Sequence, residues 1–230
     1  MADETWLLLD SRGQGGIETH VAELASGLAG AGVVPRVLFL TDHGPHPLRD
    51  RLDRDGIAWE ALRGGLAGLV RRLRQGRPAI LHTHGYKANI LGRLAARVCG
   101  IGSVATYHAG DRPGGWLAAY DWLDRWTSFA GGRIAVSQPI LDRLPFGGVL
   151  VPNFVAVADV PPEPGPETIA FVGRMSPEKG PDLFAAVATL LPGVACLAYG
   201  DGPMRAALQA EHGRRIHFAG AVASLSLIHI

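Results

Sequence analysis

Arg174 and Lys179 are two cationic side chains in one loop, residues 173–180, which follows a short β-rich run. An arginine presents a planar fork of donors and a lysine presents a point charge, so the pair suits a phosphorylated ligand. A second loop, with Gly200 and Gly202, follows the next β-rich run and strengthens the interpretation of a ligand site. The alternative is a solvated basic loop, which is the usual surrounding of such a charge pair.

Three glycines, Gly13, Gly15 and Gly16, lie between the first β-rich run and a helical pattern. Glycine lets the backbone approach a ligand closely, and the start of a helix favours an anion. The spacing is not the dinucleotide fingerprint, because Glu18 stands where the third glycine would be, and no Gly-Lys-Ser or Gly-Lys-Thr follows as in a P-loop. A tight turn without a ligand is the alternative.

His82, His84 and His108 form a third candidate group, each at or just after a predicted strand. His82 and His84 are two residues apart, so a strand points both side chains to the same face. That spacing is compatible with a metal site, with His108 as a third ligand. No cysteine or carboxylate cluster accompanies the three, so we favour histidines that line a cleft and expect no bound metal.

Strands and helices must position these residues, and β-rich runs alternate with helical patterns along most of the chain. This alternation is typical of an α/β fold with a mostly parallel sheet. In the clearest helical pattern, one apolar stripe contains Ile17, Val21, Leu24 and Leu28. Ligands of such sheets bind beyond the carboxyl ends of the strands, where all three candidate groups fall.

Prolines interrupt the alternation between residues 151 and 168, and it resumes afterwards. Proline removes backbone donors and blocks helix formation, so this segment is predicted to connect two domains. We therefore expect a first domain over residues 1–150, a proline-rich linker over residues 151–167 and the start of a second domain over residues 168–224.

The composition narrows the class of protein. The 230 residues carry 22 Lys+Arg against 21 Asp+Glu, and 47% are hydrophobic, which excludes a disordered chain and gives no reason to expect a nucleic acid partner. No apolar run reaches the roughly 20 residues that span a bilayer, and the N-terminus lacks the positive charge of a signal peptide. Two cysteines are too few for a disulfide framework, so we expect a cytoplasmic protein.

A basic amphipathic pattern lies between Leu66 and Arg77. We favour an ordinary helix that packs on the sheet and exposes a solvated basic face. The alternative is peripheral association with an anionic membrane, which would place the protein at the inner face of that membrane.

Taken together, these segments resemble glycosyltransferase family 4, a large family of retaining enzymes with the two-domain GT-B architecture. They occur in the family's order and cover the chain from Trp6 to about Ala221. The most specific stretch is GRMSPEKG, within FVGRMSPEKGPDLFAAVATLL; the others are GGIETHVAELASGL, ILHTHGYKANILGRLAA, VATYHAG, IAVSQPILDRL, VPNFV, AYGDGPMRAAL and IHFAGAV.

The resemblance implies an α/β fold with two Rossmann-like domains, the first on the acceptor side and the second, incomplete here, on the donor side. It also implies a nucleotide-diphosphate sugar as the donor, UDP- or GDP-linked, with no cofactor and no metal. The implied acceptor is a glycan or a lipid-linked molecule of the cell envelope or of an exopolysaccharide.

Individual positions match functional positions of the family. Arg174 and Lys179 match the pair that holds the donor diphosphate, and Gly15 and Gly16 match the N-terminal loop that closes over the donor. His108 matches the histidine near the donor sugar and is the catalytic candidate. The resemblance also implies candidates on the nucleoside side, which are Gly173, Gly200 and Gly202. The candidates that it implies on the acceptor side are His84, Tyr86 and Lys87.

The end of the chain departs from the family. The family's Glu-(seven residues)-Glu pattern, which contacts the donor sugar and ribose, has no match. By periodicity the last six residues, LSLIHI, form a short strand, but they are also the translation of the mosaic end of a common transposase sequencing adapter. We therefore expect residues 225–230 to be a non-native tail and the 230-residue chain to be inactive by itself.

Two other function classes stay open. One is a metal-dependent hydrolase that uses the three histidines, which the metal content of the protein would reveal. The other is a protein of the same GT-B fold that epimerises a sugar nucleotide or only binds it. Product analysis with a labelled donor would distinguish these activities from transfer.

Overall fold

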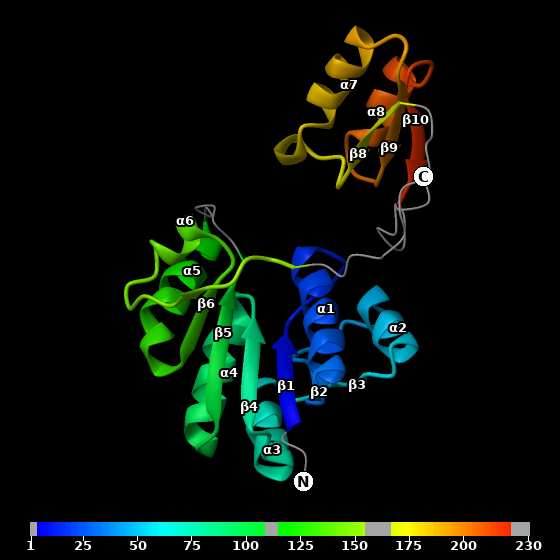
Figure 1. Ribbon diagram of the computed structural model, residues 1–230. Coiled ribbons are helices and arrows are strands. Elements are labelled where there is room, and N and C mark those ends of the chain that lie inside the picture. Colours follow the sequence, from blue (N-terminus) through cyan, green and yellow to red (C-terminus); the bar gives the residue numbers. More distant parts are fainter. Residues whose placement is uncertain (1–3, 109–114, 155–166, 222–230) are drawn as a thin grey trace. The chain divides into compact units, whose positions relative to one another are not determined.

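The computed structural model describes residues 4–108, 115–154 and 167–221 (Figure 1). The chain divides into two compact units, Met1–Ala156 and Val157–Ile230. Each unit has a parallel sheet and a hydrophobic core of its own. Residues 155–166 of the expected linker and the whole expected tail, residues 225–230, lie outside the described residues.

A seven-stranded parallel sheet forms the first unit, in the order β3-β2-β1-β4-β5-β6-β7. The strands are β1 (Glu4–Leu9), β2 (Val34–Phe39), β3 (Ala58–Ala61), β4 (Ile80–His84), β5 (Gly102–Tyr107), β6 (Gly132–Ala135) and β7 (Val149–Leu150). The chain returns from β3 across the sheet to β4, so the strand order reverses between β1 and β4. Sheets of this kind bind ligands at that reversal, beyond the carboxyl ends of the strands.

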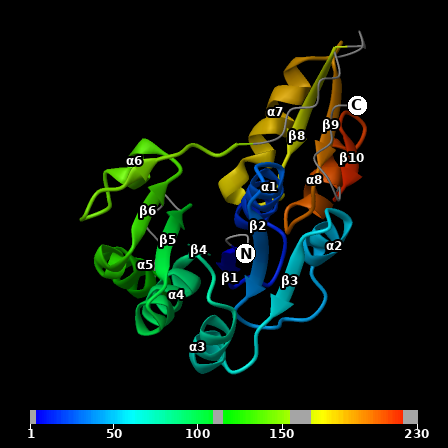
Figure 2. The same ribbon diagram turned by 60° about the horizontal axis from the view of Figure 1, so that its bottom comes forward.

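Helices cover both faces of this sheet (Figures 1 and 2). They are α1 (Gly16–Gly30), α2 (Pro47–Arg54), α3 (Gly65–Gly76), α4 (Tyr86–Cys99), α5 (Trp116–Trp126), the 3-10 helix η1 (Thr127–Ala130) and α6 (Gln138–Leu141). Successive side chains of a strand point to opposite faces, so the apolar run of β1 is buried on both. Trp6 and Leu8 pack with α3 and α4, whereas Leu7 and Leu9 pack with α1 and α2.

Helix α3 is the basic amphipathic helix expected from the sequence. Its Leu69 and Leu73 are buried in the core, and Arg72 lies over the ring of Trp6 at 4.4 Å from the centroid. The apolar stripe is therefore used for packing on the sheet, as the favoured interpretation requires. Within the described ranges, no helix combines the length and the apolar character needed to cross a bilayer.

The second unit contains a three-stranded parallel sheet in the order β10-β9-β8. Its elements are β8 (Thr168–Val172), the 3-10 helix η2 (Pro177–Lys179), α7 (Pro181–Leu190), β9 (Ala195–Tyr199), α8 (Arg205–His212) and β10 (His217–Gly220). Small residues such as Ala185, Ala188 and Ala198 allow α7 and α8 to pack closely on the sheet around the buried Met175.

Candidate functional site

Four imidazole rings gather at the carboxyl ends of β4 and β5 and beside the first turns of α1. The rings of His82 and His84 stack with centroids 4.4 Å apart, and those of His20 and His108 meet edge to face at 4.7 Å. The Nδ1 of His84 lies 3.2 Å from the Nε2 of His108, so the two share a hydrogen bond. His84 is only 1% exposed, so this acceptor-side candidate is almost completely shielded from solvent.

Burial keeps these histidines neutral near pH 7. It lowers the pKa of His82 to about 4 and that of His108 to about 3. The pKa of His84 lies well below its usual value for the same reason, and burial lowers the pKa of His20 although a hydrogen bond with Asn153 opposes this shift. A neutral imidazole has one donor and one acceptor nitrogen, which suits hydrogen bonds with uncharged hydroxyl groups.

The geometry changes which histidines would form a metal site. One nitrogen each of His20, His84 and His108 lies within 4.8 Å of the others, among the residues that the structure describes. His82 is not part of this group, and its Nε2 is 2.7 Å from the Oγ1 of Thr106. The trio His82, His84 and His108 is therefore corrected to one that contains His20. His20 follows Ile17 by three residues in the apolar stripe of α1, and this spacing is the signal that could have found it.

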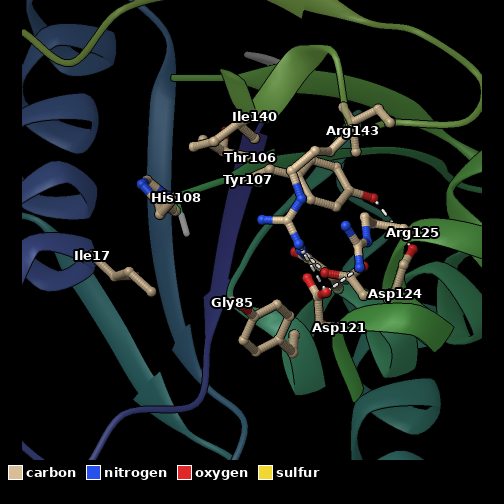
Figure 3. A pocket seen from close by; sticks show the side chains of 13 residues that line it. Ile17, Gly85, Thr106, Tyr107, His108, Asp121, Asp124, Arg125, Ile140 and Arg143 are labelled. Atoms are coloured by element: carbon tan, nitrogen blue, oxygen red, sulfur yellow. Dashed lines mark hydrogen bonds and ion pairs between the residues drawn. The ribbon is translucent and has the colours of Figure 1, made fainter. Parts of the chain in front are cut away.

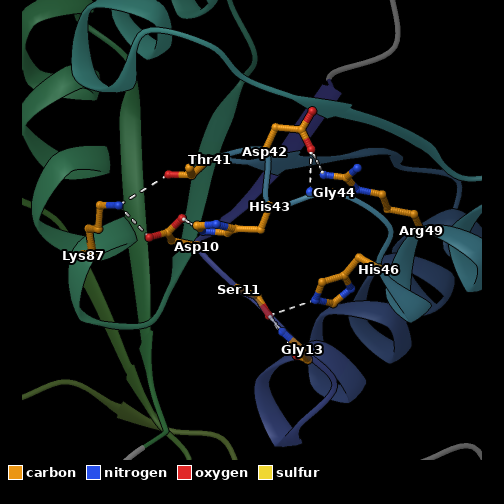
Figure 4. Close-up of polar contacts among 10 residues, drawn as sticks. All are labelled: Asp10, Ser11, Gly13, Thr41, Asp42, His43, Gly44, His46, Arg49 and Lys87. Atoms are coloured by element: carbon orange, nitrogen blue, oxygen red, sulfur yellow. Dashed lines mark hydrogen bonds and ion pairs between the residues drawn. The ribbon is translucent and has the colours of Figure 1, made fainter.

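An acid at the end of β1 holds the acceptor-side candidate Lys87 (Figure 4). The Nζ of Lys87 donates a hydrogen bond to Asp10 Oδ2 at 2.7 Å, and the Nε2 of His43 lies 3.3 Å from Asp10 Oδ1. Burial acts to raise the pKa of Asp10, but the hydrogen bonds from Lys87, Thr41 and His43 lower it below its usual value. The charge of Lys87 is therefore balanced within the protein, although its side chain is half exposed.

A pocket opens next to His108, between α4 and α5 (Figure 3). It is partly open to solvent, and both polar and apolar side chains line it. Tyr86 lines this pocket, and burial raises the pKa of its hydroxyl. Two candidates from the sequence, His108 and Tyr86, thus face one pocket.

The same pocket contains carboxylates that were not among the sequence candidates. Asp121 accepts hydrogen bonds from Arg125 and, at 3.4 Å, from Arg143. Asp124 accepts from Asn89 at 2.9 Å and pairs with Arg93 at 2.6 Å. The sequence signal that could have found these carboxylates is a pair of acids three residues apart in the largely apolar stretch WLAAYDWLDRW.

Gly15 and Gly16 begin helix α1. Gly15 is the N-cap residue and has an extended backbone, and no side chain caps the first turn. A Cβ on Gly16 would meet nothing within 4 Å, so this position borders open space. An uncapped helix start leaves backbone N–H groups available to an anion.

The loops after β8 and β9 lie against each other in the second unit. The N–H of Gly173 donates to the carbonyl of Tyr199 at 3.0 Å. A Cβ on Gly200 would lie 1.9 Å from the carbonyl oxygen of Gly173, and the φ of Gly200 is 128°, so this approach requires glycine. At Gly202, a Cβ would also collide with backbone, at 2.5 Å from the carbonyl oxygen of Met175. The three predicted nucleoside-side glycines therefore form one double loop.

Arg174 and Lys179 are exposed on the first of these loops, just before α7. Among the described residues, neither has an ion-pair partner within 4.0 Å. Glu178 lies between them, and a hydrogen bond from Ser176 at 2.5 Å lowers the pKa of its carboxyl group. The double loop thus presents two cations close to the start of a helix, which is an arrangement suited to phosphate.

Comparison with known proteins gives one family and several similar folds. The family described as Glycosyltransferase Family 4 matches residues 14–157. HepE from Anabaena, solved with UDP, has a TM-score of 0.76 at 16% identity, covering 97% of this chain and 70% of that chain. TarM from S. aureus, solved as a mutant in complex with fondaparinux, alpha-GlcNAc-glycerol and UDP, has a TM-score of 0.74 at 10% identity, covering 96% and 78%.

WaaB, described as a lipopolysaccharide outer core galactosyltransferase, has a TM-score of 0.64 at 17% identity, with 95% of this chain and 68% of that chain covered. Among curated protein sequences, none matches this chain. The likenesses confirm the α/β fold of GT-B type that the sequence predicted, with a seven-stranded parallel sheet in the first unit and a smaller sheet in the second.

Proposed function

Because this chain belongs to glycosyltransferase family 4, we propose that it takes part in retaining transfer of a sugar from a nucleotide-diphosphate sugar to a glycan or lipid-linked acceptor of the cell envelope or an exopolysaccharide. In this reaction the bond between the anomeric carbon and the diphosphate oxygen breaks. A bond from the same carbon to an acceptor hydroxyl forms on the same face, and the hydroxyl proton leaves with the diphosphate.

The observation that carries the proposal is the pair of exposed cations on the double loop, Arg174 and Lys179. As the bond to the diphosphate breaks, negative charge grows on the leaving group. Fixed cations and backbone N–H groups directed at that charge lower the barrier. In the proposal, Arg174 and Lys179 bind the diphosphate without a metal ion, and Gly173, Gly200 and Gly202 let the backbone approach the nucleoside.

On the first unit, Gly15 and Gly16 offer the start of α1 to the donor phosphates. His108 is assigned next to the donor sugar, where its neutral imidazole exchanges hydrogen bonds with sugar hydroxyls. Tyr86 faces the acceptor in the pocket, while His84 and Lys87 support this side through His108 and Asp10.

Several finer points belong to the same proposal. HepE and TarM were solved with UDP, which supports a UDP-linked donor over a GDP-linked one. We assign residues 1–150 to the acceptor domain, residues 151–167 to the linker and residues 168–224 to the donor domain. The protein is proposed to act in the cytoplasm, with action at the inner face of the membrane as the alternative. Nucleotide binding is the first measurement to make.

The test uses Arg174→Ala and Lys179→Ala, with Arg214→Ala as the matched control. Arg214 is an exposed arginine of the same unit and precedes β10, so it lies at the amino end of a strand. A hydrogen bond to a charged group contributes about 1.5–3 kcal/mol, so each site variant should bind UDP roughly 10- to 150-fold more weakly in calorimetry.

Three results would contradict the proposal. UDP and GDP that both fail to bind the folded wild-type chain would refute the donor class. Wild-type affinity in both site variants would refute the diphosphate site. A labelled UDP-sugar that is epimerised, and not transferred, by a transfer-competent form of the protein would replace the transferase with an epimerase.

The histidine geometry favours one second candidate, a metal-dependent hydrolase built on His20, His84 and His108. Catalytic zinc typically has three protein ligands and an open position. Elemental analysis of the purified protein decides between the two candidates. About one zinc per chain, lost in His20→Ala, would support the hydrolase, and metal-free protein that binds UDP would exclude it.

A further inference from the structure

A buried contact between Ser11 and His46 joins the loops that follow β1 and β2. The Nε2 of His46 lies 3.0 Å from the Oγ of Ser11, and both side chains are buried (Figure 4). Strands β1 and β2 are parallel neighbours in the sheet, so their carboxyl ends bring the two loops together. The loop after β1 leads to Gly15 and Gly16 at the start of α1.

Pro47 fixes the backbone of His46. A residue before proline is restricted to extended conformations, and His46 has a φ of −149° and a ψ of 127°. Pro47 itself occupies the first turn of α2, where its missing N–H is not needed. His46 is therefore the N-cap residue of α2, and its Nδ1 accepts a hydrogen bond from the N–H of Leu48 at 3.1 Å.

This cap decides which nitrogen of His46 carries a proton. Burial lowers the pKa of His46, although the carboxylate of Glu18 and a hydrogen bond with the Gly13 backbone oppose this shift, so the ring is neutral near pH 7. A neutral imidazole has one donor and one acceptor nitrogen. Because Nδ1 accepts from Leu48, Nε2 carries the proton and donates to Ser11. His46 therefore cannot take a proton from Ser11, which excludes this pair as a nucleophile and its general base.

Ser11 transmits this restraint to the glycine loop. Its hydroxyl donates to the carbonyl of Gly13 at 2.9 Å, and the N–H of Gly13 donates back to the same oxygen at 3.4 Å. A hydroxyl group has one donor and two acceptor positions, and the contacts with His46 and Gly13 use all three. Ser11 therefore holds both backbone groups of Gly13, two residues before the N-cap residue Gly15.

The loop between β1 and α1 needs such a restraint because it contains Gly13, Gly15 and Gly16. Glycine loses more conformational freedom on ordering than any other residue. A Cβ on Gly13 or Gly16 would meet nothing within 4 Å, so these positions border open space. A loop that is ordered before its ligand arrives binds more tightly, because less conformational entropy is lost on binding.

We propose that His46 is a positioning residue for the donor phosphates. Its ring acts through Ser11 to hold the loop in the form that presents the backbone N–H groups at the start of α1. The inference rests on the proposed function, because it concerns the binding of the donor by Gly15 and Gly16. A purely structural role of His46 would be limited to the cap of α2, and its two ring nitrogens allow the two roles to be separated.

The test compares two variants that each keep one of these contacts. The side-chain amide of asparagine reaches about as far as the Nδ1 of histidine, so His46→Asn keeps a good N-cap for α2 and loses the contact with Ser11. The longer amide of glutamine reaches about as far as Nε2, so His46→Gln keeps a donor for Ser11 and loses the cap. Ser11→Ala removes the hydroxyl itself. The control is Ser26→Ala, because Ser26 donates to Asp55 and so joins α1 to the other end of α2.

Calorimetry on the full chain measures UDP binding, and urea unfolding measures stability. His46→Asn and Ser11→Ala should bind UDP roughly 2- to 12-fold more weakly than the wild type, which is the effect of one neutral hydrogen bond on an equilibrium. His46→Gln should bind UDP nearly as tightly as the wild type, although it should unfold at a lower urea concentration because α2 loses its cap. Ser26→Ala should bind UDP as the wild type does.

Equal UDP affinity of the wild type and His46→Asn would overturn the inference, because the cap of α2 would then account for His46. Binding by His46→Gln that is as weak as that of His46→Asn would overturn it as well. If His46→Asn fails to fold, wild-type affinity in folded Ser11→Ala is the overturning result. A wild type that binds neither UDP nor GDP would instead overturn the proposed function, and this inference with it.

Discussion

Acidification from pH 7.5 to pH 5 is expected to destabilise the first unit, because its clustered histidines are neutral when it is folded. Burial lowers the pKa of His82 to about 4, that of His108 to about 3 and that of His84 well below its usual value. In the unfolded chain, each histidine titrates near its usual value of about 6.5. Below that pH the unfolded state binds more protons, so stability is present above pH 6.5 and is lost toward the folded pKa values.

The size of the loss follows from these pKa values. At pH 5, a histidine with an unfolded pKa of about 6.5 and a folded pKa of 4 or below costs about 2 kcal/mol, since each pH unit corresponds to about 1.36 kcal/mol. If the effects of His82 and His108 add, the free energy of unfolding falls by about 4 kcal/mol, out of the roughly 5–15 kcal/mol that is typical of a domain. The lowered pKa of His84 acts in the same direction. His20 shifts in the same direction.

Urea unfolding followed by tryptophan fluorescence measures this loss for the first unit alone, because all five tryptophans precede residue 127. His108→Gln removes one titrating group and should reduce the loss between pH 7.5 and pH 5 by about 2 kcal/mol. His217→Gln changes an exposed histidine of the second unit and should leave the loss unaltered.

The reasoning would be wrong if the free energy of unfolding stayed constant between pH 7.5 and pH 5. It would also be wrong if His108→Gln retained the full pH dependence of the wild type. Either result would mean that the imidazoles are solvated or charged in the folded protein.

Two further changes test the buried contacts of the two units. Asp124→Ala leaves the guanidinium of Arg93 buried without its carboxylate and should cost about 3–5 kcal/mol in urea unfolding. Asp42→Ala removes a solvent-exposed carboxylate from its pair with Arg49 and should cost much less; equal costs would contradict this difference. Gly200→Ala puts a Cβ into the double loop and should lower the stability of the second unit by about 1–3 kcal/mol in thermal melting and weaken UDP binding. Gly193→Ala, whose Cβ would meet nothing within 4 Å, is its control, and an unchanged melting temperature for Gly200→Ala would show that the loops separate easily.

Local patterns were enough to predict the alternation of strands and helices and the position of some elements. The expected apolar stripe from Ile17 to Leu28 is in α1, and β8 begins at residue 168, where the start of the second domain was expected. At the edge of the sheet, β7 has only two residues. Its side chains are exposed, so little burial supports a longer strand there.

Side-chain partners across the fold could not be predicted in the same way. Lys87 is 77 residues from Asp10 in sequence, and their 2.7 Å contact exists only because β1 and β4 are neighbours in the sheet. In α5, the residue types of WLAAYDWLDRW favour buried tryptophans and exposed acids. The ion pair with Arg93 reverses that preference.

The sequence by itself determined the alternation of strands and helices, and therefore the edge of each sheet where ligand-binding loops gather. It did so because hydrophobic periodicity and glycine and proline positions act locally. Only the tertiary structure decided that His20 joins His84 and His108, that Gly200 abuts Gly173 and that α5 faces outward. These outcomes depend on strand order and on the pairing of buried charges, which involve residues far apart in the chain.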